Sequence, residues 1–212
     1  MGNDAPATPT TRKRRRTVVL VSLGVLAAVG LAVGLLVPDQ KKPTVAVPDQ
    51  VCQELLPSTH VKPLLPENGE AFEEERSVNF GVGASKGRGS CDLSAGGSAL
   101  AISFSRIQDP EYTTDTVARQ AEEPGRTPIS LGPAAGYLGD YNAWLYAPCP
   151  HAKGRGDLLA VKVGVSGVPE IKDRATMEKV AALTADVTRA VAREVEDCEG
   201  AGELPDTAPE IG

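Results

Sequence analysis

The sequence has few residues of the types that most often hold metals or perform covalent catalysis. It contains two histidines, His60 and His151, and four cysteines, of which the closest in sequence are Cys52 and Cys91. Zinc sites usually need closely spaced pairs such as C-x-x-C, so no metal centre is expected. The motif H-E-x-x-H is also absent, and the G-x-S-x-G match at 83–87 lies in a glycine-rich stretch that precedes an expected strand and not a helix. The sequence therefore predicts no cofactor and indicates no familiar hydrolase or metalloprotease site.

Charge is absent from residues 17–37, which form a continuous run of apolar, small and hydroxyl side chains. As an α-helix, this run would be roughly 31 Å long, close to the thickness of the hydrocarbon core of a bilayer. It is longer than the apolar region of a signal peptide, and no small-x-small cleavage pattern follows it. We therefore expect 17–37 to be a retained, single-pass transmembrane helix.

A basic cluster directly precedes this run and consists of Arg12, Lys13, Arg14, Arg15 and Arg16. Basic residues beside a membrane span stay on the cytoplasmic side, so we expect a plasma-membrane protein with a cytoplasmic N-terminus and its C-terminal domain outside. The cluster can also contact anionic lipid headgroups, which makes membrane lipids an expected partner. Nucleic-acid binding is the competing interpretation, but no folded segment N-terminal to the span would present the cluster.

The charge of the chain divides unequally around the predicted span. Five basic residues and Asp4 give residues 1–16 a charge of +4. Because the whole chain carries −6, residues 17–212 carry −10. An acidic exterior argues against nucleic acid as a partner. We expect a disordered basic tail over 1–16, a Pro-containing stalk over 38–49, one domain over 50–199 and a disordered tail over 200–212.

All four cysteines follow the predicted span, on its expected extracytoplasmic side. An even number of cysteines in that compartment predicts two disulfides, for which three pairings are possible. We expect Cys52–Cys91, which would join the first element to the first hairpin, and Cys149–Cys198, which would fix the end of a long helix to the sheet. Each bond would stabilise the fold by roughly 3 to 4 kcal/mol. Four separate buried thiols are the alternative.

The outer domain shows the periodicities of both strands and helices. Leu100, Ile102 and Phe104 alternate with small residues after an "AGGS" turn, which predicts a hairpin. A second hairpin is expected from "YNAWLYAP" and "DLLAVKVGVSG". We also expect short helices in "PDQVCQELLP" and "DPEYTTDTVARQAEE".

Residues 173–198 carry an apolar stripe at three- and four-residue steps, which predicts a long helix with one buried face. The stripe consists of Met177, Val180, Thr184, Val187, Val191 and Val195. We expect this stripe to be core and not a partner-binding face. The predicted fold class is α+β: a single-pass N-terminal transmembrane helix followed by an extracytoplasmic antiparallel sheet packed against a long C-terminal helix.

Two stretches invite a functional interpretation. The glycine-rich "GVGASKGRGS" resembles a phosphate loop, but such a loop opens a helix, and a strand is expected here. The acidic run Glu73, Glu74 and Glu75 most simply forms a solvated surface. Together with Asp140, it supplies the carboxylates on which an alternative enzymatic function would depend.

Several short motifs carry a family resemblance. They are "VCQELLP" at the start of the outer domain, "CDLS" opening a strand, "YAPCP" closing one, and a final helix that ends in "DC". With the Ala/Gly/Val/Leu-rich anchor, they resemble uncharacterised membrane-anchored or secreted extracytoplasmic proteins of high-GC Gram-positive (actinobacterial) bacteria, over residues 12–198. The resemblance implies an α+β domain of the cell envelope without an established reaction, and it assigns no functional residues.

These observations favour a membrane-anchored, non-enzymatic extracytoplasmic module with a binding, sensing or structural role at the cell envelope. Its expected partner is an envelope protein or a small ligand. One alternative is a carboxylate-dependent cell-envelope enzyme, which would need converging carboxylates in a pocket. Another is an accessory subunit of a membrane complex that acts through its anchor helix.

Overall fold

The computed structural model describes residues 42–84, 86–150, 158–167 and 171–212. The predicted span, the basic cluster Arg12–Arg16 and His151 lie outside the described residues. Within them, no helix has the length and apolar character needed to cross a membrane.

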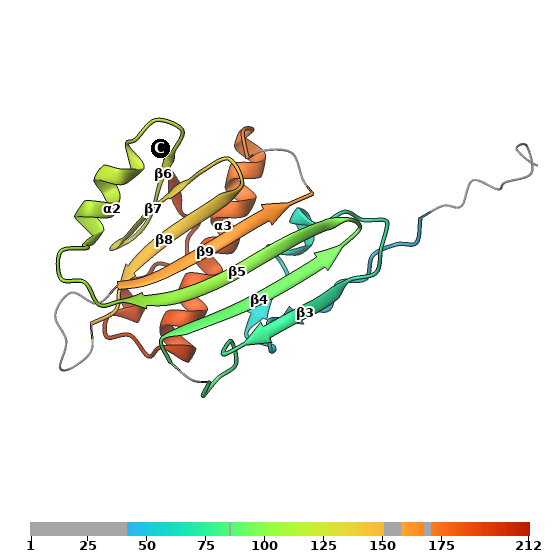
Figure 1. The fold of residues 1–212 in the computed structure, drawn as a ribbon, viewed down its shortest axis with the longest axis horizontal. Coiled ribbons are helices and arrows are strands. Elements are labelled where there is room, and N and C mark those ends of the chain that lie inside the picture. The colour runs from blue at the N-terminus through green and yellow to red at the C-terminus, as the bar shows by residue number, and fades with distance from the viewer. Residues whose placement is uncertain (1–41, 85, 151–157, 168–170) are drawn as a thin grey trace, which may run out of the picture. The chain divides into compact units, whose positions relative to one another are not determined.

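Eight antiparallel strands form one sheet in the order β10-β6-β7-β8-β9-β5-β4-β3 (Figure 1). A separate two-stranded hairpin joins β1 to β2. The strands are β1 (Gln50–Val51), β2 (Leu56–Pro57), β3 (Glu73–Val78), β4 (Arg88–Ala95), β5 (Ser98–Ile107), β6 (Thr127–Leu131), β7 (Ala134–Leu138), β8 (Asn142–Pro148), β9 (Leu158–Ser166) and β10 (Glu210–Ile211).

The long helix α3 packs behind this sheet, which confirms the predicted α+β arrangement of an antiparallel sheet on a C-terminal helix (Figure 1). The helices are η1 (Lys62–Leu64), α2 (Thr114–Ala121), α3 (Arg174–Ala190), the π-helical turn η2 (Val191–Val195) and η3 (Ala201–Glu203). Of the predicted stripe, Val180, Thr184, Val187 and Val191 are fully buried, so its assignment to the core is confirmed.

The face of the sheet toward α3 is apolar and closed. Ile102 and Phe104 of β5 and Val161 and Val163 of β9 are at most 3% exposed and belong to one core with the helix. The segment that contains β1, β2 and η1 covers the rest of this face and contributes Leu56 to the same core. This burial follows from the two-residue repeat of a strand, which sends alternate side chains to one side.

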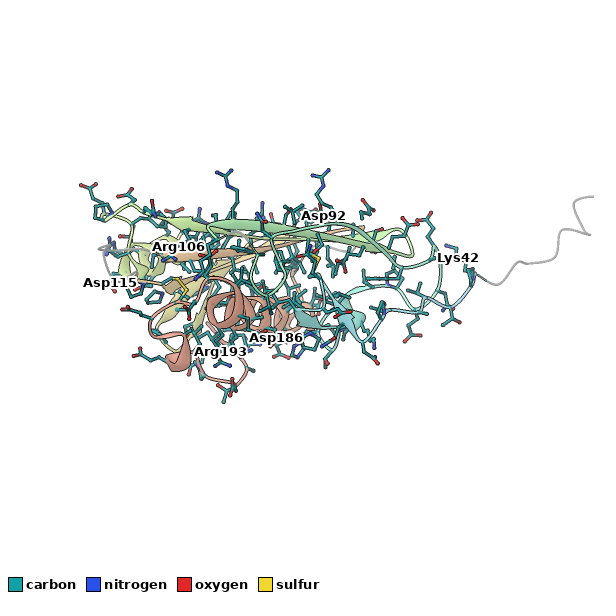
Figure 2. All side chains as sticks on the ribbon, turned by 90° about the horizontal axis from the view of Figure 1, so that it is seen from below. Lys42, Asp92, Arg106, Asp115, Asp186 and Arg193 are labelled. Carbon is teal, nitrogen blue, oxygen red and sulfur yellow. A yellow bond between two sulfur atoms is a disulfide. The ribbon has the colours of Figure 1, made fainter. Side chains whose placement is uncertain are left out.

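The opposite face of the sheet is covered at one end only. Helix α2 packs across β6, β7 and β8, where Val117 meets Tyr146 and Leu158. Over β3, β4, β5 and residues 162–166 of β9, the outward residues are partly or fully exposed. They include Ser90, Asp92, Ser94, Ala101, Ser103, Ser105, Lys162 and Gly164. Figure 2 shows the sheet as one layer with α3 beneath it and Asp92 on the opposite side.

Both predicted hairpins are confirmed as β4–β5 and β8–β9, but the hairpin β6–β7 was not expected from the sequence. Its strands contain Pro128 and Gly136, residue types that are uncommon inside strands. A Cβ atom at Gly136 would overlap the carbonyl group of Trp144 on β8, so the missing side chain permits this pairing.

The prediction of a helix in "PDQVCQELLP" is wrong, because this stretch forms the hairpin of β1 and β2. Its turn places Cys52, Gln53 and Glu54 consecutively in the left-handed region, with φ of 57°, 57° and 63°. Left-handed backbone costs roughly 1–2 kcal/mol for each non-glycine residue. Contacts from elsewhere in the fold must therefore hold the turn, and local periodicity does not reveal them.

The expected stalk over 38–49 also needs correction, because its last residues pack on the domain. The amide of Val45 donates to the carbonyl of Glu67 at 2.8 Å, and Thr44 forms a β-bridge with Asn68. Val45 is partly buried against the core. The folded unit therefore begins before residue 50, at the start of the described residues.

The tail over 200–212, expected to be disordered, is folded in the structure. It forms η3 and then β10, which adds an edge strand beside β6. Two arginines of the C-terminal helical region hold it: Arg189 donates to the carbonyl of Pro205 at 2.7 Å, and Arg193 donates to that of Leu204 at 2.9 Å. These long-range bonds leave no signal in the composition of the tail.

Candidate functional site

The two predicted disulfides are confirmed. The Cα atoms of Cys52 and Cys91 are 5.5 Å apart, and those of Cys149 and Cys198 are 4.6 Å apart. Both distances lie in the usual range for a disulfide. Each bond attaches a covering segment to the closed face: the first joins the left-handed turn to β4, and the second joins the end of β8 to the segment after η2.

The left-handed turn also depends on one of the candidate carboxylates. Glu74 accepts hydrogen bonds from the backbone amides of Cys52 at 2.8 Å and Gln53 at 3.2 Å. The Gln53 side chain donates to the carbonyl of Ser77 at 3.0 Å and accepts from the amide of Gly81 at 2.6 Å. These contacts cover part of the β3 edge, so Glu74 has a structural role.

The other candidate carboxylates do not meet at one place. Glu73 and Glu75 are exposed on β3, at one edge of the sheet. Asp140 lies in the turn between β7 and β8, where its carbonyl accepts from the amide of Ile171 at 2.8 Å. In the sheet order, β9, β5 and β4 separate β8 from β3. The described structure therefore does not bring the carboxylates of the enzymatic alternative together.

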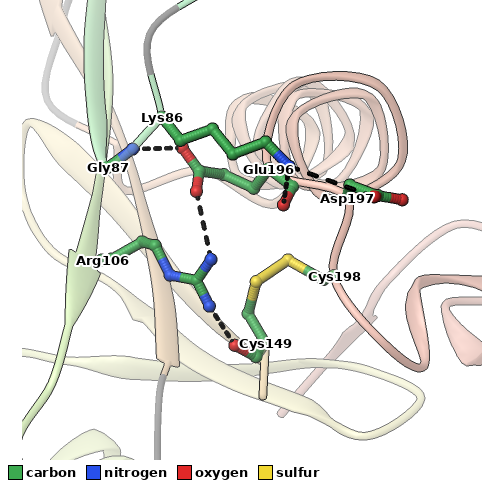
Figure 3. Close-up of a disulfide and its surroundings, with 7 residues drawn as sticks. All are labelled: Lys86, Gly87, Arg106, Cys149, Glu196, Asp197 and Cys198. Atoms are coloured by element: carbon green, nitrogen blue, oxygen red, sulfur yellow. Dashed lines mark hydrogen bonds and ion pairs between the residues drawn. A yellow bond between two sulfur atoms is a disulfide. The ribbon is translucent and has the colours of Figure 1, made fainter. Parts of the chain in front are cut away.

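A buried ion pair lies beside the second disulfide (Figure 3). The carboxylate of Glu196, which is fully buried, is 3.3 Å from the guanidinium of Arg106 and accepts from the amide of Gly87 at 2.6 Å. Arg106 also donates to the carbonyl of Cys149, and Lys86 donates to the carbonyl of Glu196 at 3.2 Å. These hydrogen bonds offset the free-energy cost of burying both charges, so the cluster has a structural role.

His60, one of the two histidines, takes part in a second network that links the N-terminal segment to α3. Its Nδ1 bonds to the carboxylate of Asp186, which also pairs with Arg189 at 2.6 Å. In the part of the chain that the structure describes, no group of three or more His, Cys, Asp or Glu side chains is placed to hold a metal ion. This contact anchors the segment around His60 to the helix.

A hollow of about 380 Å³ lies on the open face of the sheet. It is lined by Val78, Asn79, Arg88, Gly89, Ser90, Ser103, Phe104, Ser105, Trp144, Ala160 and Lys162. The register explains why the outward side chains of this set meet, whereas Phe104 belongs to the closed face. Ser90, Ser103, Lys162 and Trp144 face one another in a row across β4, β5, β9 and β8, and Arg88 opposes Ser105 in the next row.

Aromatic rings form the wall of the hollow toward α2. The Lys162 ammonium lies 5.0 Å from the centre of the Trp144 ring, a cation–π contact that orients the lysine. Trp144 also stacks on Tyr146, with ring centres 6.0 Å apart, and the ring centre of Tyr146 is 5.6 Å from that of Tyr112. Burial and a hydrogen bond with Tyr112 raise the pKa of Tyr146, so its phenol stays neutral.

Sequence reasoning did not identify the residues of the hollow. The alternation along β5 marks Ser103 and Ser105 as outward residues, but the hollow needs side chains from four strands. Arg88 lies in "GVGASKGRGS", and the strand expected after that stretch is β4. The useful signal was Lys162, a charged residue in the middle of an otherwise apolar strand.

The chain matches no protein-family model, no curated protein and no solved structure.

Proposed function

We propose that the chain is a membrane-anchored extracytoplasmic module, not an enzyme, that binds a ligand or partner on the open face of its sheet. One observation carries the proposal: two basic side chains, three serine hydroxyls and a tryptophan converge on the hollow of that face. Sites that bind small molecules typically combine an apolar wall with a few convergent polar groups.

The chemistry of the hollow suits binding better than catalysis. A serine nucleophile requires a neighbouring base, most often histidine or a carboxylate. Among the described residues that line the hollow, the ionisable groups are Arg88 and Lys162. Both are cations in their usual state and therefore favour electrostatic recognition.

The cysteines support the proposed compartment. Every cysteine is paired, and disulfides persist mainly outside the cytoplasm. We propose that residues 17–37 anchor the chain, with Arg12–Arg16 on the cytoplasmic side and in contact with anionic lipids. This is the arrangement of the actinobacterial envelope proteins that the motifs resemble.

External protease on intact cells tests the topology. It should remove the chain after about residue 40 and leave a small membrane-bound fragment, while a cytoplasmic control protein stays intact. Recovery of a mature protein that begins near Pro38 in the medium would contradict the retained anchor.

Site-specific photocrosslinking in intact cells tests the binding face. A photoreactive amino acid in place of Ser105, which lies exposed in the hollow, should capture a ligand or envelope protein. The same group in place of Lys179, exposed on α3, is the control and should not capture that species. Filling the hollow with Ser103→Trp should abolish capture from position 105.

Two outcomes would contradict the proposed binding face. One is equal capture from both positions, or capture from neither. The other is capture that persists in the filled variant. Deleting residues 1–37 tests the accessory-subunit alternative. A partner that the anchor helix holds would be lost with that helix, whereas a partner that the open face binds would still be captured.

A further inference from the structure

We propose that the hollow binds the phosphate group of a small molecule between Arg88 and Lys162, with the serine hydroxyls beneath it. This inference rests on the proposed binding function and adds the chemical class of the ligand. The observations behind it are the charge of the hollow, the positions of its donors and its size.

The hollow is a basic site in an acidic domain. Elsewhere on the surface several basic side chains pair with carboxylates, such as Lys62 with Asp49 at 3.0 Å and Arg193 with Asp206 at 3.1 Å. Within the described structure, neither Arg88 nor Lys162 has a carboxylate partner. Their charges are therefore available to an anion, and local positive potential in an acidic protein attracts one selectively.

On β4, the carboxylate closest in sequence to the residues of the hollow belongs to Asp92, which lies two residues beyond Ser90. It does not line the hollow, and the register places it opposite Arg76 on β3. Asp92 therefore limits the site on one side and sits next to a basic side chain of its own. An anion in the hollow would lie on the other side of Ser90, toward Arg88.

The two cations lie on either side of β5. Arg88 on β4 opposes Ser105, and Lys162 on β9 opposes Ser103. With about 4.8 Å between strands and about 3.4 Å per residue, the two Cα atoms are roughly 12 Å apart. Two long side chains that lean inward from this distance can contact one bound anion above β5.

Hydroxyl donors form the floor of the hollow between these cations. In the described protein, the hydroxyls of Ser90, Ser103 and Ser105 have no hydrogen-bond partner, and all three side chains reach solvent. Three hydroxyls, a guanidinium and an ammonium offer more donors than a carboxylate with two oxygens can accept. A phosphate group presents three terminal oxygens and matches this donor set better.

The size of the hollow favours a small molecule. A volume of about 380 Å³ lies at the lower end of the range for small-molecule sites. The Trp144 ring contacts the Lys162 ammonium and stacks on Tyr146. The ring therefore serves to place the ammonium group.

The chain contains a single tryptophan, Trp144, which makes the site directly observable. An anion that draws the Lys162 ammonium away from the ring changes the surroundings of the indole. We therefore expect inorganic phosphate and glycerol phosphate to change the tryptophan fluorescence of the oxidised, full-length chain in detergent micelles. The change should saturate, and sodium chloride at equal ionic strength should not reproduce it.

Two substitutions should weaken this binding by about tenfold or more each. Arg88→Gln leaves the surroundings of Trp144 unchanged and is measured by fluorescence. Lys162→Gln alters the indole contact itself, so calorimetry with glycerol phosphate measures its affinity. Arg76→Gln is the matched control, because it removes an exposed arginine from the same face outside the hollow, and it should bind phosphate as the unmodified chain does.

Several results would overturn the inference: no saturable response to either phosphate compound, equal affinity in the Arg88→Gln chain, or the same response to chloride. Binding only to vesicles of anionic phospholipid would replace the small molecule with a lipid surface. If position 105 captures a ligand while both phosphate compounds fail to bind, the binding function survives and the phosphate assignment does not.

Discussion

The two faces of the sheet differ in almost every physical property, although the same strands build both. Ile102 and Ser103 are neighbours on β5, yet the first is fully buried under α3 and the second faces the open hollow. The closed face receives both disulfides and the buried pair of Arg106 and Glu196. Stability is therefore concentrated on one face, which leaves the side chains of the other free for recognition.

The difference between the faces has a structural cause. The closed face is covered by elements from both ends of the chain, and the disulfides join these elements to the sheet. The open face has only α2, whose eight residues cover one end. A side chain on the open face can change without leaving a cavity, whereas a change on the closed face disturbs a close-packed core.

The largest effect is expected where a charge is buried on the closed face. Arg106→Met would leave the Glu196 carboxylate without its ion-pair partner in the interior and should destabilise the fold by about 3–5 kcal/mol. Adding Glu196→Leu should recover much of this loss, because the double variant buries no charge. Chemical denaturation measures both, and a double variant as unstable as the single one would contradict the assignment.

A slightly smaller effect is expected from the disulfides. Replacing Cys149 and Cys198 together with alanine should cost about 3–4 kcal/mol, because the bond closes a loop of 49 residues in the unfolded chain. Thermal melting of the purified protein measures the loss. Replacing Cys52 and Cys91 should cost at least as much, since that bond also holds the left-handed turn. A smaller loss for the Cys52 and Cys91 variant would show that the left-handed turn keeps its conformation without the disulfide.

The comparison of the faces is sharpest at neighbouring residues. Ile102→Ala should destabilise the fold by about 3 kcal/mol, because it leaves a cavity in the core. Ser103→Ala, one residue further on the open face, should change stability by less than about 0.5 kcal/mol. Denaturant unfolding of both variants tests the contrast, which fails if the two losses are similar.

The smallest effect is expected at the helix caps and depends on pH. Hydrogen bonds from the hydroxyl and amide of Thr176 lower the pKa of Asp173, the N-cap of α3. A carboxylate with a lowered pKa stabilises the fold above its ordinary pKa of 3.8, and this contribution is lost as the pH falls through the lowered value.

Asp173→Asn should therefore lower the melting temperature slightly at pH 7, with the difference from the unmodified chain vanishing in strong acid. Thr113, the uncharged N-cap of α2 on the open face, provides the control. Thr113→Ser should show the same small difference at every pH. A loss at Asp173 that does not depend on pH would show that the charge has no part in the cap.

The elements predicted correctly from the sequence are those with a strong local period. The hairpins β4–β5 and β8–β9 follow from two-residue alternation, and α3 follows from its apolar stripe. The disulfide pairs were also predicted correctly, although Cys52 lies in a left-handed turn where a helix was expected and Cys91 lies inside β4. The left-handed turn at Cys52–Glu54 and the β6–β7 hairpin were missed because distant groups, including Glu74 and Trp144, decide them.

By itself, the sequence determined the α+β class, the core of the long helix and the presence of two disulfides, because periodicity and the even number of cysteines can be read along the chain. Only the tertiary structure decided which face stays open and which side chains meet there. Arg88 and Lys162 are 74 positions apart, and they line one hollow because β5 lies between β4 and β9. Arg106 and Glu196 likewise meet through folding alone. Strand order and helix packing depend on the summed burial of many residues, which no local pattern records.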